Sequence, residues 1–273
     1  MTELVFLKLG GSLITDKDLP YTPRLDKLTE LAQEIKAALF WDRLAGIQKQ
    51  PTFKLILGHG SGSFGHTAGK KYGTRNGVHT PEEWAGFAEV RFQAAELNRY
   101  VMEALFKAGI PAISFPPSAT IISRDGKVAS YEMSAIRTAL TNNILPVVYG
   151  DVAFDEIRGG TILSTEDVFG YLARELHPQR ILLAGLEGGV WDDFPARTKL
   201  VNAISSKSYK EMRKGIGKSA SADVTGGMAA KVEEMLNLVQ QVDGLTVQIF
   251  SAEDTGNLTR VLEGDVVGTL VQK

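Results

Sequence analysis

The sequence predicts an α/β protein with a mostly parallel central sheet, arranged as an open αβα sandwich. Short apolar runs without polar alternation recur along the chain, which is typical of strands buried on both faces. Segments with helical spacing of apolar residues separate most of these runs, so strands and helices alternate. No linker rich in proline or serine and no clear repeat divides the 273 residues. We therefore expect a single domain over 1–273.

The apolar runs define the expected strands in order. Several of them end directly before a glycine, which favours a tight turn after the strand. Turn signals at Asp125–Gly126 and around Gly159–Gly160 predict two hairpins, which we expect to form a rim or lid on one side of the sheet. The expected buried strands are 4–9, 53–57, 112–115, 144–149, 180–184, 246–250 and 268–271.

Capping residues mark the starts of the expected helices. Thr22 followed by Pro23 predicts an N-cap and a first helical position. Thr80-Pro81-Glu82-Glu83 reads as a capping box that opens a long helix to about residue 107. Ser164 is expected to cap a helix over 165–176, and Gly227 precedes one that runs to about residue 239.

The composition restricts the class of partner. The net charge is −2, so no overall field favours nucleic acid or an anionic membrane. The chain has no cysteine, which excludes disulfides, thiolate metal sites and a cysteine nucleophile. The N-terminus lacks a basic region, and no apolar run approaches the ~20 residues that span a bilayer. The lack of cysteine fits a reducing compartment, so we expect a cytoplasmic protein. The four histidines show no ligand spacing, so we expect no metal cluster.

The most informative segment is the glycine-rich stretch 58–66, Gly-His-Gly-Ser-Gly-Ser-Phe-Gly-His, which follows the second predicted strand. Ligands of parallel α/β sheets bind at the carboxyl ends of strands, and glycines let the backbone N–H groups approach an anion. We interpret the stretch as a loop that holds a phosphate. His66 ends it, and we interpret this side chain as a donor to the bound anion.

Two further glycine-rich segments carry lysines. The first is 8–12, Lys-Leu-Gly-Gly-Ser, with Lys17 five residues further on; the second is 223–231, in which Lys231 lies one turn into a helix. Lys8 stands within an apolar strand, where a lysine needs an anionic partner. Three such segments with three lysines predict several converging phosphates, as the transfer of a phosphoryl group requires.

These motifs resemble the amino acid kinase superfamily. Residues 8–12 correspond to its N-terminal nucleotide loop and 223–231 to its late ATP motif, while Gly-Ser-Phe-Gly-His at 62–66 resembles the isopentenyl phosphate kinases within it. The similarity extends over essentially the whole chain. Two departures are Ser61, where that family usually has glycine, and 186–191, which replaces a more acidic segment.

The resemblance implies a homodimer that uses ATP and Mg²⁺ to convert isopentenyl phosphate into isopentenyl diphosphate for isoprenoid biosynthesis, as in a mevalonate pathway. Dimethylallyl phosphate is a second candidate acceptor. The resemblance also implies that Lys17 stabilises the transition state, and that Ser61, His66 and Gly150 hold the acceptor. Lys8 and His66 join Lys17 as the implied catalytic residues. The implied nucleotide-binding residues are Lys8, Leu9, Gly10, Gly11, Ser12, Gly62, Trp191, Gly227 and Lys231.

Chemistry narrows the role of His66. A phosphate monoester has a second pKa near ~6, so its oxygens are ionised at neutral pH and attack needs no general base. In this interpretation His66 therefore donates a hydrogen bond to the acceptor phosphate.

Other functions stay open: a kinase of the same fold for fosfomycin, another phosphonate or a carboxylate, a non-catalytic nucleotide-binding protein, and, more distantly, a nicotinamide-dependent oxidoreductase. Four residues of the long helix share one face and either fill the core or line a pocket for the acceptor tail: Trp84, Phe87, Val90 and Ala94.

Overall fold

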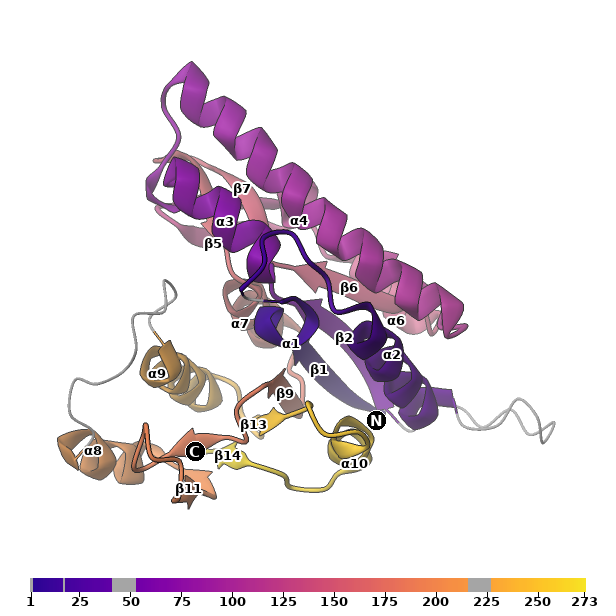
Figure 1. Cartoon of the computed structure of the whole chain (residues 1–273), viewed down its shortest axis with the longest axis vertical. Coiled ribbons are helices and arrows are strands. Elements are labelled where there is room, and N and C mark those ends of the chain that lie inside the picture. Colours follow the sequence, from indigo (N-terminus) through magenta and orange to yellow (C-terminus); the bar gives the residue numbers. More distant parts are fainter. Residues whose placement is uncertain (1, 17, 41–52, 216–226) are drawn as a thin grey trace.

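The main sheet confirms the predicted α/β architecture. The computed structural model describes residues 2–16, 18–40, 53–215 and 227–273, without the side chains of Phe40, His66 and 212–215 (Figure 1). Its 8-stranded sheet has the order β12-β14-β13-β9-β1-β2-β6-β3, and the neighbours run parallel except for β13 and β14. The strands are β1 (Glu3–Leu9), β2 (Phe53–His59), β3 (Ala112–Ser114), β6 (Leu145–Tyr149), β9 (Arg180–Gly185), β12 (Ala203–Ile204), β13 (Thr246–Ser251) and β14 (Thr269–Val271).

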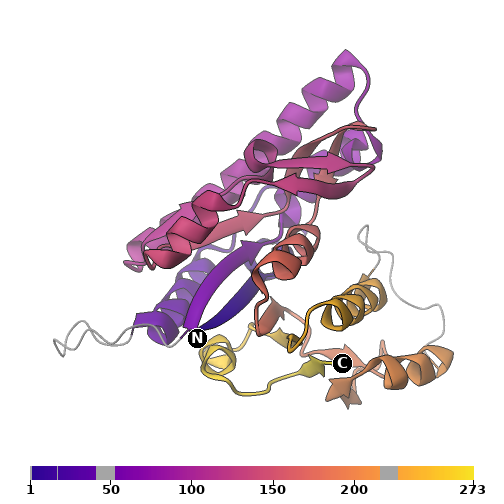
Figure 2. The same ribbon diagram turned by 180° about the vertical axis from the view of Figure 1, so that it is seen from behind.

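Helices cover both faces of this sheet, so the structure is the expected sandwich (Figures 1 and 2). Val5 and Leu7 of β1 pack in one buried cluster, and Phe6 packs in a second cluster on the opposite face. This alternation follows from the two-residue period of a strand. The helices on the first face are α1 (Gly11–Ile14), α2 (Leu25–Phe40), α3 (Gly62–Tyr72), α4 (Pro81–Lys107) and α10 (Asn257–Glu263); those on the second are α6 (Ser134–Thr141), α7 (Thr165–Leu176), α8 (Ser206–Gly215) and α9 (Gly227–Gln241).

The two predicted hairpins form a second, 4-stranded sheet of order β5-β4-β7-β8. Asp155 holds their turns together, because its carboxylate accepts hydrogen bonds from the backbone N–H groups of Asp125, Gly126, Ile157 and Arg158. These strands are β4 (Ile121–Arg124), β5 (Lys127–Tyr131), β7 (Asp151–Asp155) and β8 (Gly159–Leu163); the remaining elements are α5 (Pro117–Thr120), the 3₁₀ turn η1 (Thr74–Asn76), β10 (Val190–Trp191) and β11 (Leu200–Val201).

The predicted helix caps are partly confirmed. Thr80 and Ser164 form capping boxes at the starts of α4 and α7. The start predicted at Thr22 and Pro23 is wrong, because Pro23 forms a β-bridge with Thr15 and α2 begins at Leu25. Pairing with a segment near in space thus outweighs the local N-terminal signal.

The interpretation of 58–66 as one long loop is also wrong. Strand β2 continues through His59, and α3 begins at Gly62, so the connection is only Gly60 and Ser61. Gly62 has a φ of +48°, which glycine adopts without strain and which turns the strand into the helix. Phe64 is buried and fixes the first turn of α3 against the core. Packing decides this helix, because its glycines and serines give little helical propensity.

Candidate active site

The first two glycine segments touch each other at the carboxyl ends of β1 and β2. The N–H of Gly60 donates to the carbonyl of Leu9 at 2.9 Å. A Cβ atom on Gly11 would lie only 2.4 Å from the backbone N of Gly62, and one on Gly60 would lie 2.8 Å from the N of Gly11. Only glycines allow this approach, which places the starts of α1 and α3 side by side as a backbone surface suited to phosphate.

Thr15 joins these two segments, although sequence reasoning did not select it. Its hydroxyl accepts a hydrogen bond from the N–H of Ser63 at 3.0 Å and donates to the carbonyl of Gly11 at 2.8 Å. Thr15 is 1% exposed, so the contact is protected from water. Thr15 thus fixes the start of α3 relative to α1. Of the other predicted nucleotide-binding residues in this segment, Leu9 is buried in the core and Ser12 is exposed.

Gly150 lies beside the short connection, as the sequence predicts for a shared site. Its N–H donates to the carbonyl of His59 at 3.2 Å. A Cβ on Gly150 would lie 3.8 Å from the N of Ser61 and 3.8 Å from the N of Thr165. The Ser61 hydroxyl instead lies over the first turn of α3, since a Cβ on Gly65 would be 2.3 Å from its Oγ. The backbone of Ser61, not its side chain, therefore faces Gly150.

Lys8 has the anionic partner that its position requires, and that partner is Glu166. The Nζ of Lys8 forms a close ion pair with Oε1 of Glu166, and both side chains are nearly buried. Lys8 extends from the face of β1 that α7 covers, and Gly58 on the neighbouring strand leaves room for Thr165 and Phe169 of that helix. The sequence analysis predicted an anionic partner for Lys8 and assigned the lysine to nucleotide binding and catalysis. It did not find Glu166, whose local signal is its place in the first turn of α7.

Lys231 of α9 approaches the same carboxylate. Its Nζ lies 3.9 Å from Oε1 of Glu166. Burial alone would raise the pKa of the Glu166 carboxyl, but the charges of Lys8 and Lys231 outweigh it and lower the pKa to about 2. The carboxylate is therefore ionised at neutral pH, and the three side chains together carry one net positive charge. The structure thus brings two of the three predicted lysines together.

Trp191 and Gly227 are placed, and the remaining predicted site residues lie outside the description. Trp191 is half-buried in β10, which follows the carboxyl end of β9, and its indole N–H donates to Glu187 at 3.2 Å. Gly227 is the first residue of α9 and has a φ of +69°. The backbone of His66 belongs to α3. Lys17, residues 223–226 and the side chain of His66 lie outside the described residues.

The described ranges, 2–16, 18–40, 53–215 and 227–273, lack two kinds of feature. In these ranges, no group of three or more His, Cys, Asp or Glu side chains is arranged to hold a metal ion. Within the same ranges, no helix is both long and apolar enough to cross a membrane. What the described site does offer is closely packed glycine backbone beside paired cations, an arrangement suited to phosphate.

This combination of fold and site has a known counterpart. Residues 3–251 match the model of the amino acid kinase family, and the chain belongs to that family. The isopentenyl phosphate kinase of Methanocaldococcus jannaschii is 33% identical over 271 residues, which cover 97% of each chain. The isopentenyl phosphate kinase of Methanothermobacter thermautotrophicus is 33% identical over 275 residues, again 97% of each chain. The family resemblance that the motifs indicated is thereby confirmed.

Solved structures agree with this assignment. An X-ray structure of isopentenyl phosphate kinase superimposes with a TM-score of 0.81 at 30% identity and covers 98% of this chain and 100% of its own. An isopentenyl phosphate kinase substrate complex, 22% identical, gives a TM-score of 0.74 and supports the fold. The α/β sandwich of this chain is thus that of the amino acid kinases.

Proposed function

We propose that this protein transfers the γ-phosphoryl group of ATP to isopentenyl phosphate, forming isopentenyl diphosphate and ADP as a step of isoprenoid biosynthesis. The observation that carries the proposal is the meeting of the Gly11 and Gly62 backbones beside the Lys8–Glu166–Lys231 group. The identity to isopentenyl phosphate kinases over nearly the whole chain supports the acceptor. These residues lie on β1 of the contiguous main sheet and on helices that pack against that sheet, which supports the reading of 1–273 as one domain.

In this proposal an oxygen of isopentenyl phosphate attacks the γ-phosphorus, and the bond from that phosphorus to the β,γ-bridging oxygen breaks. ADP leaves with the bonding electron pair. The acceptor oxygen is already ionised, so the chain needs no general base. Its task is to overcome repulsion between two polyanions, about 4 kcal/mol per charge pair at ~4 Å and an effective dielectric constant near 20. Backbone amides and cations aimed at the gap supply this stabilisation.

The nucleotide is assigned to the β1 and α9 side of the site. Gly11 and Gly62 are proposed to offer backbone N–H groups to its phosphates, while Lys8 and Lys231 offer positive charge. The N–H of Gly10 donates to the carbonyl of Ala184 at 2.8 Å, so Gly10 is proposed to border the phosphates without donating to them. Glu166 holds both ammonium groups in place, because its ionised carboxylate lies between them. Leu9, Ser12 and Gly227 are proposed to border the same phosphate region through their backbone, and Trp191 is proposed to line the adenine. Lys17 is proposed to contact the transferring phosphoryl group.

The acceptor is assigned to the connection between β2 and α3. The backbone of Ser61 and Gly150, which face each other, together with the His66 side chain are proposed to hold its phosphate. Of the four helix residues that the sequence left open, Phe87, Val90 and Ala94 are buried, and Trp84 is 37% exposed. A small apolar cluster that includes Ala68 of α3 is proposed to receive the five-carbon tail; its members are Ala68, Val78, Phe87, Val90, Val152 and Ile162.

Mg²⁺ is proposed to enter with the nucleotide. The described residues offer no cluster of three ligands. Mg²⁺ is a hard cation that prefers oxygen ligands, and the phosphate oxygens of ATP would supply them. When bound, Mg²⁺ neutralises charge on the β- and γ-phosphates. The protein's own part is to hold the phosphates with amides and lysines.

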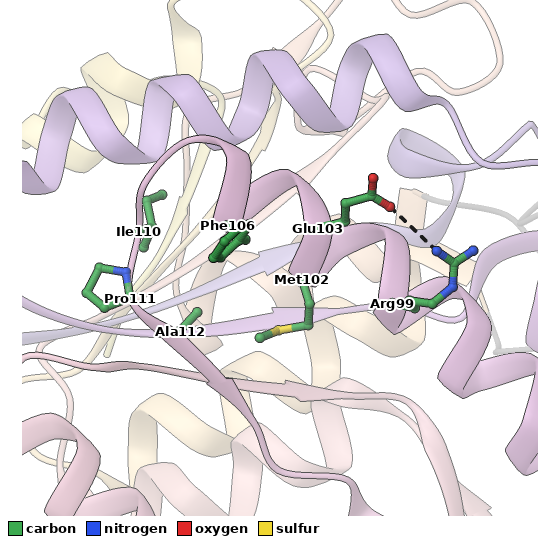
Figure 3. A pocket seen from close by; sticks show the side chains of 7 residues that line it. All are labelled: Arg99, Met102, Glu103, Phe106, Ile110, Pro111 and Ala112. Carbon is green, nitrogen blue, oxygen red and sulfur yellow. Dashed lines mark hydrogen bonds and ion pairs between the residues drawn. The ribbon is translucent and has the colours of Figure 1, made fainter.

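A homodimer is proposed through the outer face of α4 and the edge strand β3. Phe92 and Phe106 are 60% and 82% exposed on α4, and Ile113 is 47% exposed on β3. Figure 3 shows the adjoining pocket, in which Arg99 pairs with Glu103 on the same face of the helix. A two-fold interface repeats one patch on both subunits, so these opposite charges can meet across it. The seven residues that line the pocket are Arg99, Met102, Glu103, Phe106, Ile110, Pro111 and Ala112.

An ADP-release assay tests the proposed reaction. The purified protein is incubated with ATP, Mg²⁺ and one acceptor at a time: isopentenyl phosphate, dimethylallyl phosphate, fosfomycin or N-acetylglutamate. We expect turnover with isopentenyl phosphate that exceeds turnover with fosfomycin and N-acetylglutamate by at least about 100-fold in kcat/KM. A preference for fosfomycin or N-acetylglutamate would show that the preferred molecule, and not isopentenyl phosphate, is the substrate. ATP binding without turnover on any acceptor would favour the non-catalytic alternative.

A further inference from the structure

His59 is a buried histidine immediately before the short connection between β2 and α3. It is 0% exposed, and its ring stacks on Tyr149 of the neighbouring strand with 5.1 Å between centroids and an interplanar angle of 7°. It projects from the face of the sheet that α4 covers, since Asn98 of that helix contacts it. Lys8 leaves the adjacent strand on the opposite face, toward α7. The phosphoryl-transfer scheme above gives the His59 side chain no task.

The carbonyl of His59 joins two parts of the proposed site. It accepts the N–H of Gly150 at 3.2 Å and the hydroxyl of Thr165 at 2.6 Å. Thr165 directly precedes Glu166, the partner of Lys8. One peptide oxygen thus fixes the spacing between the acceptor side, at Gly150, and the ion pair of the nucleotide side.

The imidazole of His59 contacts the connection itself. Its Nδ1 lies 3.1 Å from the carbonyl oxygen of Gly60. Its Nε2 lies 3.2 Å from Oδ1 of Asn98, and the Nδ2 of the same amide donates to the hydroxyl of Ser114 at 3.0 Å. Because a carbonyl oxygen only accepts hydrogen bonds, Nδ1 must carry the proton in this contact.

The protonation state of the ring follows from its surroundings. Burial lowers the pKa of His59, and the nearby positive charge of Lys8 acts in the same direction. A neutral ring with its proton on Nδ1 has Nε2 as an acceptor. An acceptor at Nε2 requires the Asn98 amide to be turned over from the orientation given above, which is allowed because the two ends of an amide have the same shape. In the turned orientation the amide N–H donates to Nε2 and the amide oxygen accepts the Ser114 hydroxyl, so each of these groups has a partner.

The contact to the Gly60 carbonyl controls the next N–H group. A trans peptide is planar, so the carbonyl of Gly60 and the N–H of Ser61 point in opposite directions. With that carbonyl held by His59, the N–H of Ser61 is directed away from the imidazole. The N of Ser61 is also the atom that lies near Gly150. Gly60 is free of side-chain constraints, and without an anchor its peptide plane could rotate.

We propose that His59 is a positioning residue for phosphoryl transfer: its Nδ1–H anchors the Gly60 carbonyl and thereby aims the Ser61 amide at the acceptor phosphate, while its own carbonyl fixes Gly150 and Thr165. Asn98 and Ser114 hold the ring in the required tautomer. The inference rests on the proposed function for the identity of the acceptor. The anchoring of Gly60 itself is independent of that identity.

Two matched substitutions separate the ring nitrogens. The side-chain amide nitrogen of His59→Asn occupies the place of Nδ1 and retains the donor to Gly60, whereas that of His59→Gln reaches toward Asn98 and loses it. We expect His59→Gln to lower kcat for isopentenyl phosphate by about 10–100-fold, the size of effect expected when one aimed donor is misplaced. We expect His59→Asn to stay within about threefold of wild type, and the affinity for ATP to change by less than about threefold in both variants.

The outcomes of this comparison are distinct. A merely structural role would lower the melting temperature of both variants and leave kcat of the folded protein unchanged, which would overturn the proposal. Activity of His59→Gln at or above that of His59→Asn would also overturn it.

A spectroscopic measurement covers the case in which a variant does not fold or the acceptor is a different molecule. The ¹⁵N spectrum of the wild-type histidines, with His59 assigned by comparison with a folded His59 variant or by its contacts to Asn98, should show protonated Nδ1 and bare Nε2 at pH 7. A proton on Nε2 of His59 would refute the anchoring. Absence of turnover on isopentenyl phosphate in the wild type, with Nδ1 protonated, would refute the proposed substrate and leave the anchoring standing.

Discussion

Lys8 and Glu166 form a buried ion pair although 158 residues separate them in the chain. Strand β1 supplies the lysine and the first turn of α7 supplies the carboxylate. Lys231 of α9 lies 3.9 Å from the same oxygen, so one anion orders two cations from opposite ends of the sequence. This arrangement keeps positive charge in a nearly buried site before any nucleotide binds.

Removal of the Glu166 charge should impair both stability and turnover. In Glu166→Gln the two ammonium groups repel each other, and Lys8 stays buried without an anion. We expect a loss of about 3–5 kcal/mol in the free energy of unfolding and a fall in kcat of about 10–100-fold, measured by urea titration and ADP release. Glu166→Asp keeps the charge on a shorter side chain. Its free energy of unfolding and its kcat should lie between those of wild type and Glu166→Gln. A kcat within twofold of wild type in Glu166→Gln would contradict the role assigned to the pair.

The same carboxylate predicts a pH dependence of stability. The pKa of Glu166 is lowered to about 2 in the folded protein, below its ordinary value of 4.5. Its contribution is therefore fully present above pH 4.5 and is lost as the pH falls through 2, a change of up to about 3 kcal/mol. The difference in unfolding free energy between wild type and Glu166→Gln should shrink from pH 6 to pH 2.5. Using the difference cancels other groups, such as Asp151, whose pKa is raised by burial. Parallel curves of unfolding free energy against pH for the two proteins would show that Glu166 does not cause the pH dependence.

His66 is expected to act on the acceptor alone. In His66→Ala the phosphate of isopentenyl phosphate loses a charge-assisted donor, which is worth about 1.5–3 kcal/mol. We expect kcat/KM for isopentenyl phosphate to fall about 10–100-fold while the affinity for ATP, measured by calorimetry, stays within about threefold. Equal losses for both ligands would place this side chain elsewhere.

Gly11 should not tolerate even a methyl group. A Cβ there would lie 2.4 Å from the backbone N of Gly62, so the two glycine segments must separate. We expect Gly11→Ala to destabilise the protein by roughly 1–3 kcal/mol and to weaken ATP binding. Gly185→Ala is the matched control, since a Cβ there has nothing within 4 Å, and it should stay within about 0.5 kcal/mol of wild type. Similar midpoints of urea unfolding for the two variants would refute the close contact.

The proposed dimer can be tested at its most exposed aromatic residues. Charges at Phe92→Glu and Phe106→Glu would be buried without partners in the interface, so the double variant should be monomeric. Val266 is 64% exposed between α10 and β14, outside the proposed interface elements, and Val266→Glu serves as the control. Analytical ultracentrifugation at micromolar concentration measures both. A monomeric wild type, or a double variant that remains dimeric, would remove this face as the interface.

Local signals predicted most of the fold. The apolar runs gave the main strands within a few residues, and the capping boxes at Thr80 and Ser164 gave the starts of α4 and α7. Such signals act within one or two turns of the chain, so they can be read without the partner. They failed at α3, whose first residues look like a loop. There the burial of Phe64 and the turn at Gly62 outweigh weak helical propensity.

By itself the sequence determined an αβα sandwich, glycine segments at the strand ends, and a lysine at position 8 that required an anion. Only the tertiary structure decided which anion this is, because Glu166 reaches Lys8 through the packing of α7 on β2, where Gly58 leaves space for Thr165 and Phe169. It likewise decided that His59 lies against Gly60 and Asn98. Propensity and periodicity depend on near neighbours, whereas the partner of a buried charge is chosen by elements that meet only when the sheet and its helices pack together.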